Sequence, residues 1–341
     1  MIDNIAKALG VSKTTVSRAL SGNGRVSEKT RERILRYTAE IGYVPNAAAR
    51  NLATTKTRNI AFSMPLNRDA TRSSYFLECF FGVSNIAASA SYDLIMVGDE
   101  LDQINRIIQS RKADGMVLTR NIIGDAALER LADAGIPIVL TGVTTAPNVT
   151  QVSYDGMSAF KDLTSLLIDS WGNNIGLIVT NHAYPANKAR AQGFSDAFHA
   201  KHLPPPVIAW DAVTEDDMYL AFRKLYESGI RNIICGDDVV CVGILNFIKG
   251  GGRYRSKTEN KANSMRNGAA ASRTDFELIR YSDINLASFH DSHYLATFHP
   301  EIPVVNFDPR RLGDAACKML ISKIEGSATP AVSHLDYEIR I

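Results

Sequence analysis

Lys13, Thr14 and Arg18 are side chains whose types and spacing suit one chemical task. They lie within the stretch Ile5 to Leu20, on the polar side of a short segment whose apolar residues recur at helical spacing. Arg can donate two hydrogen bonds to guanine O6 and N7, Lys can donate to the same atoms, and Thr offers a hydroxyl and a methyl group. These side chains therefore suit contacts with base edges in the major groove of DNA.

Two short helices joined by a tight turn are expected to position these side chains. Gly10 separates the two apolar groups and can adopt the left-handed conformation that ends a helix. Ser12 can cap the second helix, and Ser27 can cap a third helix that runs from Glu28 to about Ile41. An ordinary helical hairpin would show the same pattern, so the remaining sequence has to decide.

The distribution of charge favours a DNA-binding head on a separate body. Of the 38 Lys/Arg and 36 Asp/Glu in the 341 residues, residues 1–58 hold eleven and four, a net charge of +7, which leaves −5 for the rest. With 45% hydrophobic and 22% charged residues, the chain has the composition of a folded globular protein with two or three domains. A basic head on an acidic body is typical of a polyanion-binding module attached to another domain.

Cysteine usage and hydropathy exclude several other classes. Cys79, Cys235, Cys241 and Cys317 are scattered, with no C-x-x-C pair and no Cys/His cluster at zinc spacing, so no metal or cofactor is expected. There is no apolar signal segment and no run of the ~20 apolar residues that a membrane span needs. We therefore expect a cytoplasmic protein that has no membrane partner.

Residues 45–58 connect the expected head to the body and begin with a short helical stretch. Pro45 suits a helix start and the following alanines favour helix, but about two turns are too short to hold as an isolated helix. Leu52 is the only large apolar residue in the helical part. The segment should therefore become ordered only against a partner.

From Asn59 on, short apolar runs alternate with helical segments, which is the pattern of parallel sheets covered by helices. Two doubly wound sheets are expected, and such folds bind ligands at the carboxyl ends of the strands. We expect strands at 59–65, 93–98, 115–118, 137–140, 175–179, 232–235, 276–281, 303–308 and about 331–340, and helices at about 75–90, 101–111, 125–134, 156–171, 190–201, 239–249 and 310–325.

The sequence of residues 2–53, almost without a gap, resembles the DNA-binding head and hinge of the LacI/GalR family of bacterial transcriptional regulators. The resemblance implies an α/β protein with a three-helix helix-turn-helix head, a hinge helix and a two-lobed core like that of periplasmic binding proteins. It implies four parts: a DNA-binding domain at 1–44, a hinge at 45–58, a core N-subdomain at 59–150 and 291–326, and a core C-subdomain at 151–290 and 327–341.

The same resemblance implies roles in DNA binding, with double-stranded operator DNA as the partner. Lys13, Thr14 and Arg18 fall where relatives read base edges, and Leu52 falls where a hinge leucine wedges into the minor groove. Leu52 could instead pack on the core. A homodimer on a roughly palindromic operator is expected, since no leucine-heptad tail follows. The residues that fall where relatives bond phosphates are Ser12, Thr15, Ser17, Ser21, Ser27 and Thr30.

The resemblance also implies an effector site between the lobes. Arg190 matches the family's effector-binding arginine, able to hold a hydroxyl pair or a carboxylate with its planar fork. Ser282-Asp283 stands where we expect the family's G-[FY]-D-[DN] motif, so a serine replaces the ligand-facing aspartate. The full set of expected effector contacts is Ser74, Tyr75, Phe76, Arg190, Asp237, Ser282 and Asp283.

A sugar is the expected effector, because paired hydroxyls suit Asp and Arg and aromatic faces suit sugar rings. A purine-type corepressor is the alternative, and the sequence does not fix the sign of the response.

A repressor is the expected regulator, whereas a solute-binding protein would not need residues 1–53. An enzyme would have to use the histidines of His290-Asp291-Ser292-His293 with His299, which have no matched carboxylates. Residues 250–275, which are rich in Gly, Ser and basic residues, read as a surface loop or as a further contact with DNA or a partner.

Overall fold

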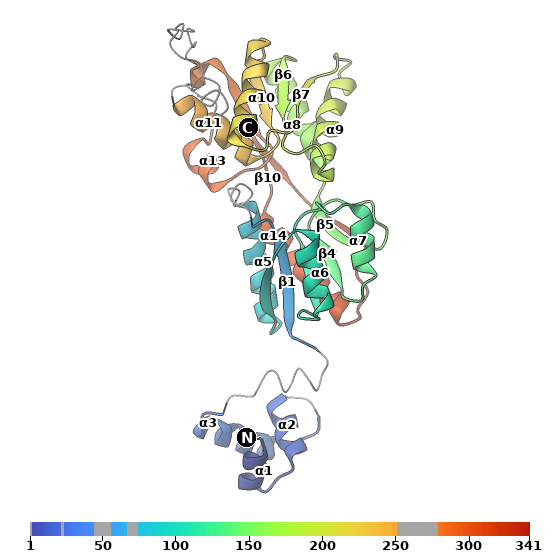
Figure 1. Cartoon of the computed structure of the whole chain (residues 1–341). Helices are drawn as coiled ribbons and strands as arrows, with labels where there is room; N and C mark the ends of the chain where they lie inside the picture. The colour runs from blue at the N-terminus through green and yellow to red at the C-terminus, as the bar shows by residue number, and fades with distance from the viewer. Residues whose placement is uncertain (1, 22–23, 44–55, 67–73, 251–278) are drawn as a thin grey trace, which may run out of the picture. The chain divides into compact units, whose positions relative to one another are not determined.

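The computed structural model describes residues 2–21, 24–43, 56–66, 74–250 and 279–341. The chain divides into two compact units, a head of Met1–Thr57 and a core of Arg58–Ile341 (Figure 1). Leu52, nearly all of the expected hinge and nearly all of the 250–275 segment lie outside the described residues. No helix in the described part of the chain is long and apolar enough to cross a membrane.

The head is the three-helix unit that the sequence predicts. Gly10 has a φ of 60° and lies between the first two helices, as expected for a residue that ends a helix in the left-handed conformation. A small apolar core, with Ile5, Val16 and Ile34 fully buried, holds the helices together. The helices are α1 (Ile2–Leu9), α2 (Lys13–Ser21) and α3 (Glu28–Glu40).

The first lobe of the core is a parallel six-stranded sheet with the order β11-β5-β4-β3-β1-β2. In β1, Ile60 and Phe62 face α5 and α14, whereas Ala61 faces α6 and α7, so alternate residues serve the two apolar layers. The strands are β1 (Asn59–Met64), β2 (Asp93–Gly98), β3 (Gly115–Leu118), β4 (Ile138–Leu140), β5 (Thr150–Tyr154) and β11 (Val332–Leu335). The helices are α5 (Tyr75–Ser89), α6 (Leu101–Gln109), α7 (Asp125–Ala132) and α14 (Pro309–Ile324).

The second lobe repeats this plan with the strand order β12-β10-β9-β8-β6-β7, in which only the β10–β12 pair is antiparallel. Helices α8 and α9 cover one face, and α10, α11 and α13 cover the other. The strands are β6 (Ile175–Ile178), β7 (Val207–Ala209), β8 (Asn232–Cys235), β9 (Asn285–Ser288), β10 (Val304–Asn306) and β12 (Glu338–Arg340). The helices are α8 (Gly156–Trp171), α9 (Pro185–Ala200), α10 (Glu215–Glu227), α11 (Asp238–Lys249) and α13 (His293–Phe298), with a 3-10 turn, η2 (Tyr281–Asp283).

The last crossings between lobes differ from the expected boundaries. Residues 291–306 were assigned to the first lobe, but α13 packs in the second and β10 pairs with β9 and β12 there. Residues 327–341 were assigned to the second lobe, but β11 pairs with β5 of the first, and only β12 joins the second. The single strand expected at 331–340 is therefore two short strands in different sheets. Strands of three or four residues carry too little pattern to show which sheet they join.

One predicted strand is wrong over its described part. Residues 279–280 are not in a strand, and Tyr281 begins the 3-10 turn η2. The strand that follows α11 in the second sheet is β9, Asn285–Ser288. The sequence pattern did not indicate this strand, because its first and last residues are polar, although Leu286 and Ala287 are buried. Because the strand lies later in the chain than expected, the turn that follows it and faces the ligand also lies several residues later.

Candidate functional site

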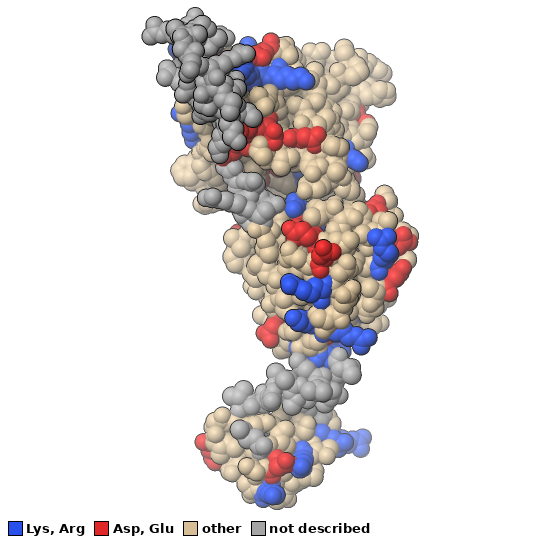
Figure 2. Space-filling view, viewed as in Figure 1, with Lys and Arg blue, Asp and Glu red and all other residues tan. Residues whose placement is uncertain are grey.

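The expected base-reading side chains share one exposed side of α2. Lys13, Thr14 and Arg18 are all exposed. Lys13 Nζ forms an ion pair with the carboxylate of Asp3 in α1, and this hydrogen bond lowers the pKa of Asp3. Arg18 lies so close to Gly24 that a Cβ at that glycine would come within 2.9 Å of Arg18 Cδ. The face of the head seen in Figure 2 carries Lys and Arg side chains beside a smaller number of acidic ones.

The expected phosphate contacts include two helix caps. Ser12 Oγ accepts from the Thr15 backbone N–H at 3.0 Å, and Ser27 Oγ accepts from the Thr30 N–H at 3.4 Å. Ser12, Ser17 and Ser27 are exposed, and the two threonines are partly exposed. Ser21 is the last residue of α2. The hydroxyls of Ser12, Thr15, Ser17, Ser27 and Thr30 lie where a surface contact with phosphate is possible, and those of Ser12 and Ser27 also cap helices.

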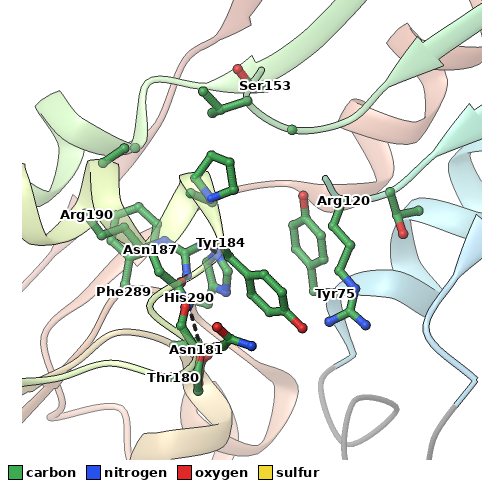
Figure 3. Close-up of a pocket in the computed structure, with 18 of the residues that line it drawn as sticks. Tyr75, Arg120, Ser153, Thr180, Asn181, Tyr184, Asn187, Arg190, Phe289 and His290 are labelled. Atoms are coloured by element: carbon green, nitrogen blue, oxygen red, sulfur yellow. Dashed lines mark hydrogen bonds between the residues drawn. The ribbon is translucent and has the colours of Figure 1, made fainter. Parts of the chain in front are cut away.

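A cavity of about 310 Å³ lies between the two lobes of the core, lined from both sheets (Figure 3). This volume is at the small end of the range of about 300–1,000 Å³ that small-molecule sites occupy. Most polar lining residues follow the carboxyl ends of strands, as the fold requires. The residues that line the cavity include Tyr75, Phe76, Thr119, Arg120, Tyr184, Asn187, Arg190, Asp237, Asp238, Phe289 and His290.

Arg190, on α9, is held in the cavity wall by neutral acceptors. Its NH1 donates to Asn187 Oδ1 and to the Gly236 carbonyl, both at 3.1 Å, and its NH2 lies 3.2 Å from His290 Nε2. The guanidinium stacks over the Phe289 ring at 4.5 Å. Burial lowers the pKa of Arg190, and the nearby Asp237 opposes that shift. Arg190 remains charged, because a guanidinium is not deprotonated in proteins.

Asp237 also lines the cavity, but it has a structural task as well. Its carboxylate is the N-cap of α11 and accepts from the Val240 N–H at 3.0 Å. Burial raises its pKa, while the Val240 hydrogen bond and the charge of Arg190 act in the opposite direction. The expected cavity position of Asp237 is thus observed, together with a capping role.

Two of the three residues expected from the first lobe reach the cavity. Tyr75 and Phe76, at the start of α5, line it, and their rings meet edge to face at 5.3 Å. Burial raises the pKa of Tyr75, so its hydroxyl keeps its proton. Ser74 borders a neighbouring hollow, formed with residues of α11 and α13, rather than this cavity.

Ser282 and Asp283 do not line the cavity, contrary to the expectation. Both are exposed in η2, where Asp283 accepts from the Arg280 N–H. The carboxyl end of β9 instead presents Phe289 and His290 to the cavity. The run Ser288-Phe289-His290-Asp291 therefore fits the family's G-[FY]-D-[DN] motif better than Ser282-Asp283 does. A histidine occupies the position of the first aspartate of that motif. The misplaced strand at 276–281 caused this error.

Sequence reasoning missed Arg120 and the cavity role of His290. Arg120 follows β3, donates from Nε to Asp99 at 2.5 Å, and lies over the rings of Phe76 and Tyr184 at 5.8 and 5.3 Å. Its place directly after a buried strand could have indicated it. The buried Thr119 hydroxyl beside it has no hydrogen-bond partner in the described structure.

The histidines considered as a catalytic cluster are separated in the structure. His290 faces Arg190, whereas His299 pairs with Glu301 at 3.1 Å. Asp291 holds Arg340 at 3.0 Å, and His293 begins α13 and is exposed. The histidines that an enzyme would have to use thus lie in three different environments.

Two family descriptions match the chain. Residues 1–46 match the bacterial regulatory proteins of the lacI family, and residues 66–336 match the periplasmic binding proteins and sugar binding domain of the LacI family. The regulator RafR of Escherichia coli is 31% identical over 226 residues, which cover 65% of this chain and 67% of RafR. The regulator CelR of Thermobifida fusca is 24% identical over 347 residues, which cover 97% and 94% of the two chains.

Solved structures agree on the fold. The lac repressor dimer bound to operator and the anti-inducer ONPF has a TM-score of 0.77 at 16% identity, with 100% of this chain and 97% of that chain covered. The complex of CelR with cellobiose has a TM-score of 0.68 at 20% identity, with 100% and 98% covered. Together with the helix-turn-helix head and the two-lobed core, these matches show that the chain belongs to the LacI family and is a DNA-binding transcriptional regulator controlled by an effector.

Proposed function

We propose that the effector is a sugar bound in the cavity between the lobes, where Arg190 is its principal polar contact. The observation that carries this proposal is the cavity wall itself, in which the guanidinium of Arg190 lies over the Phe289 ring and the rings of Tyr75, Phe76 and Tyr184 line the same cavity. A planar fork suits paired hydroxyls, and aromatic faces suit the apolar faces of sugar rings. A family description that names a sugar-binding domain, and the cellobiose bound to CelR, support the same class.

At the DNA end, Lys13, Thr14 and Arg18 would read base edges, and Leu52 would wedge into the minor groove. Exposure of the first three on one side of α2 supports this assignment. The phosphate contacts would come from Ser12, Thr15, Ser17, Ser21, Ser27 and Thr30. Two copies of the chain would bind a roughly palindromic operator. The protein would act there as a repressor, in the cytoplasm.

Effector control would act through the angle between the lobes. Tyr75 of the first lobe and His290 of the second stack at 5.3 Å with an interplanar angle of 8°, so the cavity has walls from both sides. A ligand that binds one inter-lobe arrangement better than another shifts the population toward it. The segments between lobes and head would pass that shift to the DNA-binding helices.

Isothermal titration of the full-length protein with neutral sugars, acidic sugars and purines tests the effector class. Arg190→Ala should abolish binding of the sugar that the wild type binds, while Arg223→Ala should not. Arg223 is an exposed arginine that pairs with Glu227 and lies outside the cavity lining. Binding of purines alone would contradict the sugar assignment and support the corepressor alternative. Equal binding by both variants would contradict the role of Arg190.

A further inference from the structure

His290 replaces a carboxylate with an imidazole whose hydrogen-bonding direction is fixed. An arginine can only donate hydrogen bonds, so His290 Nε2, 3.2 Å from Arg190 NH2, must be the acceptor. The neutral ring then carries its proton on Nδ1. Burial and the positive charge of Arg190 both lower the pKa of His290, which favours this neutral form. The Nδ1–H group has no hydrogen-bond partner among the described residues.

The ring of His290 is held in place by its neighbours. Tyr75 stacks on it, and the Phe307 ring meets it edge to face at 5.6 Å. Ser288 Oγ donates to the His290 carbonyl at 2.8 Å and fixes the turn after β9. The adjacent carboxylate of Asp291 is engaged with Arg340 and does not line the cavity. The end of β9 thus offers the cavity an N–H donor and no carboxylate.

Arg120 adds a second guanidinium from the opposite lobe. Only its Nε is used by Asp99, and its terminal nitrogens make no hydrogen bond to any residue that the structure describes. Figure 3 shows Arg120 and Arg190 on different sides of the cavity, with Tyr75, Tyr184 and His290 in the region between them. Each arginine has N–H groups left over for a ligand, since a guanidinium carries five.

Among the described residues, the two carboxylates that line the cavity, those of Asp237 and Asp238, are engaged or covered. Asp237 caps α11, and Asp238 is only 4% exposed, which leaves little of its carboxylate for a ligand. The donors that remain for a ligand include N–H groups of Arg190, Arg120 and His290. A ligand that supplies anionic oxygen atoms would satisfy these donors best, because charge-assisted hydrogen bonds are the stronger ones.

We propose that His290, with Arg190 and Arg120, makes this cavity selective for a sugar that carries an anionic group, a carboxylate or a phosphate, over the corresponding neutral sugar. The inference rests on the proposed sugar function and narrows it. His290 is the specificity-determining residue, since it donates where an aspartate would accept and repel. Arg190 sets the direction of the imidazole and binds the same anionic group.

The test is isothermal titration of the full-length protein with matched series of glucose, glucuronate and glucose 6-phosphate, and of cellobiose and cellobionate. One acidic member should bind at least about tenfold more tightly than its neutral parent, the difference expected from one charge-assisted hydrogen bond. The affinities of the sugars that carry a carboxylate, compared with the affinity of the sugar phosphate, show which anionic group the cavity prefers. Neutral parents that bind as tightly as the acids would overturn the inference and leave the sugar function standing.

The variant His290→Asp should reverse this preference, with weaker binding of the acid and tighter binding of the neutral parent. His293→Asp is the matched control, because it makes the same change at an exposed histidine outside the cavity lining. His290→Gln, which keeps an N–H donor without charge, should retain the preference for the acid. An unchanged ratio in His290→Asp, with an unaltered melting temperature, would overturn the role of His290. Absence of binding by every sugar in the series would instead contradict the proposed sugar function.

Discussion

At the scale of single residues, the contact between Arg190 and His290 determines what the cavity can bind. The guanidinium has a fixed charge and the imidazole can lose or gain one, so their 3.2 Å contact favours the neutral histidine. This arrangement should make the stability of the core depend on pH. The same contact occupies the acceptor Nε2 of His290 and leaves the Nδ1–H group of the ring as a donor.

His290 should contribute a measurable slope to stability below pH 6.5. Its folded pKa lies well below the ordinary 6.5, so between these two values the unfolded chain binds more protons than the folded one. Stability is therefore lost as the pH falls through this window, by at most about 1.4 kcal/mol per pH unit. Urea unfolding at pH 7.5, 6.5 and 5.5 should show a shallower loss in His290→Gln than in the wild type. A parallel loss in both proteins, or an equal change in the control His293→Gln, would contradict this explanation.

Arg18→Ala should weaken operator binding by about 1–3 kcal/mol and relax the preference at one base position in each half-site. The reason is the loss of a bidentate contact to guanine. Fluorescence anisotropy with the selected operator and with random duplex DNA measures both effects. Arg36→Ala, which removes an exposed arginine of α3, should weaken the two DNAs to the same small extent. If Arg18→Ala also weakens both equally, Arg18 contacts phosphate rather than bases.

The family resemblance implied Tyr75, Phe76, Arg190 and Asp237 as effector contacts, and all four line the cavity. It misplaced Ser282 and Asp283 because their position depended on a strand boundary. The sequence singles out His290 only among the histidines that an enzyme would have to use, because nothing local shows that it faces an arginine 100 residues earlier in the chain. Such a contact depends on the packing of α9 against the end of β9.

At the scale of elements, close helix packing holds the first lobe together. Helices α5 and α14 run side by side in Figure 1, and glycines let their backbones meet. A Cβ at Gly82 would come within 2.1 Å of the Arg310 carbonyl oxygen, and one at Gly313 within 2.1 Å of the Cys79 carbonyl oxygen. A Cβ at Gly193 of α9 would likewise come within 2.2 Å of the Met157 carbonyl oxygen of α8. Both lobes therefore depend on a helix contact that excludes a larger residue.

Gly313→Ala should destabilise the core by about 1–3 kcal/mol or more, because only a shift of one helix backbone can make room. Gly243→Ala in α11 is the matched control. A Cβ there would meet only the flexible Met218 side chain, at 2.8 Å, so its effect should be below about 1 kcal/mol. Urea unfolding of the two variants measures the difference. Equal stability would show that α5 and α14 can separate at little cost.

Most elements of the core were predictable because their apolar patterns are long or continuous, as α8 at 156–171 illustrates. The sheet that each short strand near the end joins was not predictable, although the strand expected at 303–308 contains β10. Strands β10, β11 and β12 have three or four residues each, and their pairing partners lie far away in sequence. Assignment to one sheet or the other is settled by tertiary packing that a local pattern does not contain.

At the scale of the whole molecule, the chain joins a DNA-binding head to a two-lobed core with a ligand-sized cavity between its lobes. The final segments cross between lobes twice, after β10 and after β11, so a change in the angle between the lobes must bend these connections. A ligand held by Arg190 in one lobe and by Arg120 in the other would bind some angles better than others. The coupling free energy between such sites is typically about 1–3 kcal/mol.

The most direct test of effector control measures operator affinity with and without a bound sugar. An operator is selected from a random duplex library with the purified protein, and its affinity is measured by fluorescence anisotropy at fixed salt concentration. A saturating sugar, identified by titration, should change the wild-type affinity by about fivefold or more. The same sugar concentration should leave the affinity of Arg190→Ala unchanged. An operator affinity that stays constant in the wild type while calorimetry shows the sugar bound would contradict effector control through the cavity.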